Sequence, residues 1–347
     1  MHTVSMARAL VGLWFGVMAT VAQAASLRTV TDVWGGNGTD NIAQGCTTYG
    51  PIPDLGSFFN GGGFRVLGGN EACGYVGVTS DKTAASGPLL TQQTLAPVPL
   101  DTVGGTYKGA AGARAAYGSL GVASSGIHVG ASGSTTAVFS TGAAFFQDTL
   151  TASSPLVSPS APGFVRYVFS MDGALSAPLD QRGTASVQLN IQQGSGQVLG
   201  LGRLAVQAGD LGAFSAIDSN PGGWSLGVGS VAGADVFGST VHVPFFGDVD
   251  LPMIWGSPWE LKVGLLAQSG HTSDASFLST ANLVDVQVFD AAHQRITDFT
   301  LVSSSGTDYL APVPEPATWG LCLLGLVAIG MRCGQATANR PRTRSLS

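Results

Sequence analysis

Short apolar runs separated by turn signals fill residues 106–310, and this pattern restricts the chain to one fold class. The run 186–192 alternates polar and apolar residues as a half-buried β-strand does, and clusters such as Asn220-Pro221-Gly222-Gly223 interrupt the runs. No segment has the spacing of a long amphipathic helix. Many short strands at close spacing predict an all-β protein, an antiparallel, jelly-roll-like β-sandwich. Strands are expected at 164–170, 186–192, 197–206, 240–246, 259–267, 282–289 and 296–302.

The composition favours strands over helices. Charged residues make up only 10% of the 347 residues, so i,i+4 ion pairs are scarce, and the 50 glycines are weak helix formers. So much Gly and Ser is also compatible with disorder. The hydrophobic content of 44% argues against it, because such a chain can bury enough apolar surface to offset the entropy of ordering.

Charge is distributed unevenly along the chain. The formal net charge is −6, and every acidic residue lies between Ala25 and Pro316. An acidic body repels phosphate backbones, so no nucleic-acid partner is expected. The ends are basic, where membrane topology signals belong. The basic residues outside the body are Arg8, Arg332, Arg340, Arg342 and Arg344.

The N-terminus, residues 1–24, is predicted to be a secretory signal peptide. Arg8 precedes an apolar run at 9–21, and Ala22-Gln23-Ala24 supplies the small-x-small pattern of a signal peptidase site. Cleavage is expected between Ala24 and Ala25. The alternative is a buried helix of the fold, but the run sits at the extreme terminus and ends at a cleavage pattern. Export across a bacterial inner membrane follows.

The C-terminus contains a second apolar run at 317–331, interrupted only by Thr318. As a single transmembrane helix it would cover roughly 22 Å, short of the ~30 Å hydrocarbon core, so it would be a marginal anchor. The arginines that follow, Arg332, Arg340, Arg342 and Arg344, are expected to stop transfer and to stay in the cytoplasm.

Residues 312–347 resemble a known sorting signal. Val313-Pro314-Glu315-Pro316, the apolar run and the trailing arginines are similar to the PEP-CTERM signal of Gram-negative bacteria. The resemblance implies processing near Pro314-Glu315-Pro316 by exosortase, a membrane enzyme, in proteins that accompany exopolysaccharide production. The two prolines bar a helix and leave Glu315 in an extended, accessible peptide. An ordinary tail anchor is the alternative.

Parts of the body resemble bodies that precede the same signal. Residues 145–150 (FFQDTL) are similar to their F-x-D-T-L strand, and 279–309 to their closing strands, with Ser305-Gly306-Thr307-Asp308-Tyr309 near the end. Those families are mostly of unknown function. The resemblance therefore supports a β-sandwich at 106–311 and leaves its activity open.

Residues 25–105 form a Gly-rich segment with few regular runs, expected to be rich in loops. Cys46 and Cys73 are the cysteines of the mature body. In an oxidising periplasm they are expected to form one disulfide, with a stabilisation of about 3–4 kcal/mol. A metal pair is the alternative, but no histidine flanks either cysteine at ligand spacing.

Several patterns have chemical interpretations that their context does not favour. Residues 223–227 match G-x-S-x-G, but no helix follows as a nucleophile elbow requires. Asp248-Val249-Asp250 is a calcium corner or a pair of solvating loop acids, and the second interpretation is preferred. Trp224, Trp255 and Trp259 could stack on sugar rings, but core packing is preferred. The body's histidines are His128, His242, His271 and His293, which lie far apart in sequence.

The sequence thus predicts no catalytic residue, no metal ligand and no cofactor. The expected function is that of an exported envelope or extracellular-matrix protein, structural or adhesive and associated with exopolysaccharide. It would pass through an inner-membrane-anchored intermediate before it reaches the cell surface or the medium, with signal peptidase and exosortase as processing enzymes. The alternative is a secreted carbohydrate-binding or carbohydrate-hydrolysing protein.

Overall fold

The computed structural model describes residues 25–36, 50–51, 55–59, 64–65, 75–100, 105–129, 138–178, 183–208, 214–219, 240–242 and 245–311. No helix within these ranges is long and apolar enough to cross a bilayer. Several sequence predictions lie outside the described residues. They are the signal peptide with Ala24, the residues Cys46, Cys73 and Trp224, the G-x-S-x-G match, and the whole sorting tail at 312–347.

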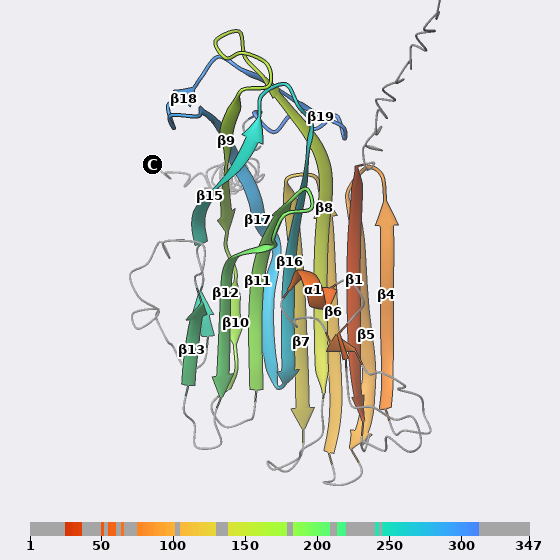
Figure 1. Cartoon of the computed structure of the whole chain (residues 1–347). Helices are drawn as coiled ribbons and strands as arrows, with labels where there is room; N and C mark the ends of the chain where they lie inside the picture. The colour runs from red at the N-terminus through yellow and green to blue at the C-terminus, as the bar shows by residue number, and fades with distance from the viewer. Residues whose placement is uncertain are drawn as a thin grey trace, which may run out of the picture.

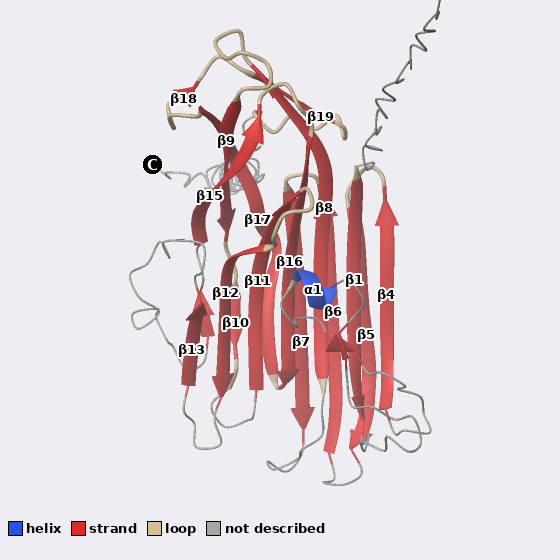
Figure 2. Cartoon of the chain, viewed as in Figure 1, coloured by secondary structure: helices blue, strands red, loops and turns tan. Residues whose placement is uncertain are grey.

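The described strands form two large antiparallel sheets packed together as in a sandwich (Figure 1, Figure 2). The first sheet has the order β13-β12-β11-β16-β8-β1-β4, and β19 also pairs with β8. Its strands are β13 (Phe214–Ser219), β12 (Leu199–Ala208), β11 (Gly183–Gln193), β16 (Trp259–His271), β8 (Phe139–Ser153), β1 (Ser26–Gly36), β4 (Tyr75–Ala84) and β19 (Thr300–Ser303).

The second sheet has the order β14-β10-β17-β7-β6-β5. The long strand β17 pairs with β7 and β10 through its first half and with β9 and β18 through its second half, and β15 pairs with β9. Its strands are β14 (Thr240–His242), β10 (Ala174–Ser176), β17 (Ser273–Asp290), β7 (Ser119–Val129), β6 (Gly105–Ala116), β5 (Leu89–Leu100), β9 (Pro162–Met171), β15 (Phe245–Ile254) and β18 (Arg295–Ile296).

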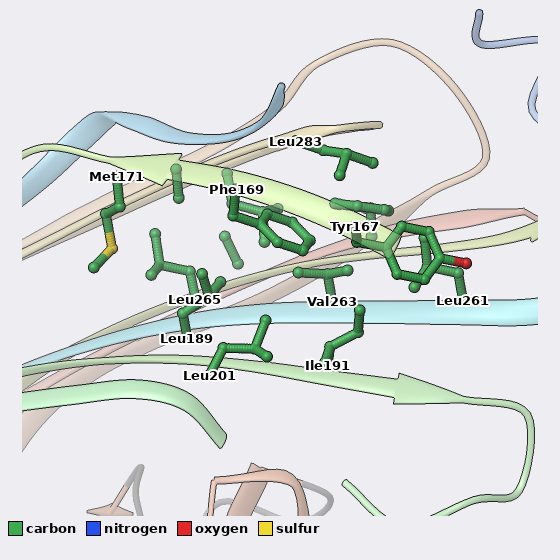
Figure 3. Packing of buried hydrophobic residues seen from close by; sticks show 14 of the residues in the cluster. Tyr167, Phe169, Met171, Leu189, Ile191, Leu201, Leu261, Val263, Leu265 and Leu283 are labelled. Atoms are coloured by element: carbon green, nitrogen blue, oxygen red, sulfur yellow. The ribbon is translucent and has the colours of Figure 1, made fainter. Parts of the chain in front are cut away.

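The main core lies between the two sheets. Strand β9 of the second sheet directs Tyr167, Phe169 and Met171 toward the side chains of β11, β12 and β16 in the first (Figure 3). Because side chains alternate along a strand, every second residue of these strands enters the core. Full burial of each large apolar side chain contributes about 1.5–3 kcal/mol. The facing residues are Leu189, Ile191, Leu201, Leu261, Val263 and Leu265.

The other half of the sandwich combines larger buried side chains such as Tyr107 and Leu95 with many small residues. Strand β6 contributes Ala111, Ala113 and Ala115 to the core. A Cβ atom added to Gly142 of β8 would lie 2.4 Å from the carbonyl oxygen of Gly112. The two sheets therefore approach each other closely here, and only glycine fits between the backbones. This close packing accounts for part of the high glycine and alanine content.

A short outer layer covers the first sheet. Helix α1 (Leu55–Phe58) lies over β1, β8 and β16, where Phe58 and Phe59 pack on the ring of Phe145 at centroid distances of 5.5 and 5.3 Å (Figure 2). The side-chain amide of Asn190 donates to the backbone oxygen of Phe58. Strand β1 is consequently buried on both faces. Two two-residue strands flank α1 and pair with each other, β2 (Gly50–Pro51) and β3 (Phe64–Arg65).

The structure confirms the all-β class and differs from the sequence predictions in detail. Residues 25–105 were expected to contain few regular runs, yet β1, β4 and β5 are long strands of the two sheets. Strand β1 is buried on both faces and so lacks the alternation that marks a half-buried strand. The expected strand at 240–246 is divided into β14 and β15, and that at 296–302 into β18 and β19.

Candidate functional site

One buried carboxylate stands out in the described structure. Asp148 lies on β8 with 1% of its surface exposed. A buried charge is costly unless hydrogen bonds compensate for the lost water, and the partners of Asp148 are numerous. Its carboxylate accepts from the Ser304 hydroxyl at 2.7 Å, the Ser305 backbone N–H at 3.0 Å and the Tyr309 hydroxyl at 2.8 Å. The Ser305 hydroxyl also donates to it.

All these donors come from the last part of the described chain. Strand β19 pairs with the end of β8, and the chain then turns at Gly306, whose φ of 76° favours glycine. The turn brings Tyr309 back beside β8, where its ring stacks on Phe146 at a centroid distance of 6.4 Å. We call Asp148 with Ser304, Ser305 and Tyr309 the carboxylate latch. It holds the C-terminal segment on the body.

The latch depends on a phenol that keeps its proton and donates it to a hydrogen bond. Burial and the neighbouring Asp148 carboxylate raise the pKa of Tyr309 far above its usual value of 10.0. The pKa of the partly buried Tyr117 is raised as well, by desolvation and then by Asp148. Both phenols therefore stay protonated, and Tyr309 remains a hydrogen-bond donor throughout the physiological range.

The latch joins two segments, 145–150 and 305–309, that lie far apart in the sequence. Asp148 is the acid of the segment 145–150, and Ser305 and Tyr309 are the ends of the segment 305–309. Each was noted for its resemblance to other exported bodies, but nothing in the sequence predicted their contact. The signal that would have found it is a lone acid in an otherwise uncharged strand, because such an acid requires hydrogen-bond donors when it is buried.

Strand β1 begins at the same end of the sandwich. Ser26, the first residue of β1, pairs in register with Gln147, the neighbour of Asp148. Ala25 is the residue expected to follow signal cleavage. The two segments predicted to contact the membrane, 1–24 and 312–347, are therefore joined to the body at one end (Figure 1).

The acids of the Asp248-Val249-Asp250 pattern lie on strand β15, not in a loop. Arg166 of β9 donates to both carboxylate oxygens of Asp250 at 2.6 and 2.8 Å, and lies 3.4 Å from Asp248. These hydrogen bonds lower the pKa of Asp250 and raise that of Arg166. The arrangement is an ion-pair cluster in which a guanidinium occupies the position that a cation would take.

Two of the described histidines lie close together in the structure. His128 and His271 are brought together with ring centroids 5.9 Å apart, and burial lowers the pKa of His128. His293 stacks on Phe164 at 3.9 Å. Across the described ranges, no group of three or more His, Cys, Asp or Glu side chains could hold a metal ion. His242 belongs to β14.

Two tryptophans considered as sugar platforms are core residues. Trp255 and Trp259 are 1% and 9% exposed, which confirms core packing for this pair. The indole N–H of Trp259 donates to the Tyr167 hydroxyl at 2.7 Å, so its polar atom is satisfied inside the core.

Fold and site together define a two-sheet antiparallel β-sandwich. The described ends of its body lie at the same end of the sandwich, where a buried carboxylate holds the segment up to Tyr309. Comparison with known proteins gave no matching family model, no matching curated protein and no matching solved structure.

Proposed function

We propose that the chain is an exported envelope or extracellular-matrix protein, structural or adhesive, that is associated with exopolysaccharide and delivered by its C-terminal tail. The observation that carries the proposal is the carboxylate latch. It fixes Tyr309 on the body, and only residues 310–312 separate Tyr309 from the motif at 313–316. A folded body thus ends just before the peptide that exosortase would process.

The geometry suits a two-step membrane route. The signal peptide at 1–24 and the tail at 312–347 join the body at the same end, so the sandwich can fold on the outer side while both segments remain in one membrane. Signal peptidase would release the first, and exosortase the second. In this route the short apolar run at 317–331 acts as a single, temporary transmembrane helix.

Within the two-sheet class we propose a jelly-roll-like connectivity. Its support is the repeated passage of the chain between the sheets. Strands β4 and β5 belong to different sheets, as do β7 and β8, β8 and β9, β10 and β11, and β16 and β17. Such crossings are typical of Greek-key sandwiches.

Intact-mass measurement of the secreted protein tests the proposal. In cells that have an exosortase, the mature form should start at Ala25 and lack Arg344. A variant with Pro314→Ala, Glu315→Ala and Pro316→Ala, which leaves the described body untouched, should keep its tail and stay in the membrane fraction. An intact Arg344 in most secreted or surface molecules would contradict processing and favour an ordinary tail anchor.

A further inference from the structure

Exposed aliphatic side chains occur at the end of the sandwich that bears the latch. They are Leu156 at 68% exposure, Ile254 at 48%, Val302 at 64% and Leu310 at 39%. Single exposed aliphatic residues are common on soluble proteins. These four differ because they occur where the chain leaves the body toward its expected membrane segment.

Hydrogen bonds join the segments that carry these residues. Val302 pairs with Thr151 in the β8–β19 ladder. The turn after Ile254 is held to the end of β8, because the Gly256 N–H donates to the Ala152 carbonyl at 2.8 Å. The Ser154 hydroxyl donates to the Asp298 carbonyl at 2.6 Å, which joins the loop of Leu156 to the segment before β19. In Figure 1 these segments form the upper end of the molecule.

The latch limits how far this end can lie from the membrane. Tyr309 is fixed to β8, and residues 312–316 separate the described chain from the apolar run at 317–331. A fully extended chain spans at most about 3.6 Å per residue, so these residues reach roughly 18 Å. While the tail is anchored, the latch end must therefore stay close to the lipid surface. Strand β1, which follows the signal peptide, begins at this end too.

We infer that the latch end rests on the bilayer surface in the tail-anchored intermediate, with Leu156, Ile254, Val302 and Leu310 in contact with lipid. The inference rests on the proposed function, because it requires the tail to be a membrane anchor. Asp298 and Asp308 are exposed on the segments that carry Val302 and Leu310, and they disfavour anionic headgroups. The latch end therefore suits a bilayer with zwitterionic headgroups. In the docked state the opposite end of the body points away from the membrane.

Strand β7 supplies a matched control for this contact. A Cβ atom added to Gly118, just before β7, would lie 3.4 Å from the Tyr309 ring, so β7 begins at the latch end. Val129 is at its other end, roughly 33 Å away at about 3.3 Å per residue. Val129 is 63% exposed and Val302 64%, so the two valines differ in position and hardly in accessibility.

The experiment uses the full-length chain, with its tail, in vesicles of phosphatidylcholine and phosphatidylethanolamine. A benzophenone amino acid replaces either Val302 or Val129, and protein–lipid adducts are counted by mass after illumination. We expect at least a fivefold higher lipid-adduct yield at position 302. Alkaline carbonate extraction, run in parallel, reports whether the chain is anchored.

The outcomes distinguish the docked orientation of the body from the anchoring of its tail. An anchored chain with equal lipid-adduct yields at both positions would overturn the docked orientation and leave the tail anchor standing. Protein–protein adducts in place of lipid adducts at position 302 would overturn it in favour of a second copy of the chain. Release of the protein by carbonate would overturn the anchor, and the docking with it.

Discussion

The Tyr309 hydroxyl donates to the Asp148 carboxylate at 2.8 Å across a separation of 161 positions in sequence. This bond fastens the C-terminal segment to a central strand of the first sheet. Strand β19 adds only the pairs from Thr300 to Ser303 with the end of β8. The segment before residues 313–316 is thus held by the bonds of several side chains to one buried acid as well as by backbone bonds to β8, so we expect its attachment to be sensitive to that acid.

Replacing Asp148 by alanine should release the C-terminal segment. The change leaves the hydroxyls of Ser304, Ser305 and Tyr309 without their acceptor, and each buried unsatisfied donor costs about 1–3 kcal/mol. Because the segment can open to water, we expect a loss of about 2–4 kcal/mol in the free energy of unfolding. Denaturant unfolding measures it, and hydrogen exchange at the Ser305 amide should accelerate.

The control for this change is Asp172→Ala, which removes an exposed acid outside the latch. It should alter the free energy of unfolding by less than about 0.5 kcal/mol. Equal effects of the two substitutions, or an unchanged exchange rate at Ser305, would show that the latch does not hold the segment.

The buried Tyr107 predicts a loss of stability in alkali. Desolvation raises its pKa from 10.0 to about 12, although its hydroxyl is 3.0 Å from the Ser140 hydroxyl. The folded state keeps the phenol neutral, whereas the unfolded chain loses the proton from about pH 10. The contribution is therefore complete below about pH 10 and is lost as the pH rises to about 12. It amounts to about 2–3 kcal/mol, since one pKa unit corresponds to about 1.4 kcal/mol.

Chemical denaturation at pH 9 to 12 measures this dependence. The Tyr107→Phe variant should lose stability less steeply than the parent over that interval. The variant will still lose some stability through Tyr167 and Tyr309, whose pKa values are also raised by burial. Parallel curves for parent and variant would show that Tyr107 ionises equally well in both states.

The pair Arg166–Asp250 should contribute to stability at neutral pH and not in strong acid. The guanidinium holds the pKa of Asp250 below 3.8. Its contribution is therefore present above about pH 3.8 and is lost as the pH falls through the lower pKa of the folded state. Because both side chains are partly exposed, at 33% and 27%, the coupling should be about 0.5–1 kcal/mol.

A double-mutant cycle with Arg166→Gln and Asp250→Asn at pH 7 measures the coupling. The pair Arg28–Asp81 has similar geometry and a more exposed carboxylate at 44%, and it should give a smaller coupling. A larger value for the more exposed pair would contradict the argument from burial.

Two facing glycines give a test of the close sheet packing. A Cβ atom added to Gly142 would lie 2.4 Å from the Gly112 oxygen and 2.7 Å from the Ala123 oxygen, and both are backbone atoms that cannot move aside. Gly142→Ala should cost about 2–3 kcal/mol or prevent folding. Gly112→Ala meets first a side-chain carbon of Leu278 at 3.3 Å, and should cost less than about 1 kcal/mol. Thermal unfolding of both variants measures which substitution lowers the stability more.

Cys46 and Cys73 lie outside the described residues, and their disulfide remains a prediction. The mass of the protein should rise by about two hydrogens after reduction if the bond is present. A Cys46→Ser, Cys73→Ser double variant should lose about 3–4 kcal/mol of stability. An unchanged mass after reduction would show that Cys46 and Cys73 do not form a disulfide.

Sequence reasoning identified strands that have one face toward solvent and the other face buried in the core. The run 186–192 alternates and lies within β11, whose inner residues enter the core. It missed β1 because Val30 and Val33 lie on opposite faces and both are buried, under α1 and under the second sheet. It also gave no link between the segments 145–150 and 305–309, which together contribute most residues of the carboxylate latch. The partners of Asp148 depend on the return of the chain after Gly306, which no local pattern reveals.

The register of β1 has a practical consequence for protein engineering. Ser26 is paired with Gln147, and Tyr309 is bonded to Asp148, so the two ends of the body lie beside adjacent residues of one strand. A short peptide could join them after removal of residues 1–24 and 312–347. New ends could then be opened in the turn at residues 194–197, where Ser195, Gly196 and Gln197 are exposed. The body is therefore suited to circular permutation, which would replace the two termini beside Gln147 and Asp148 with termini in that turn.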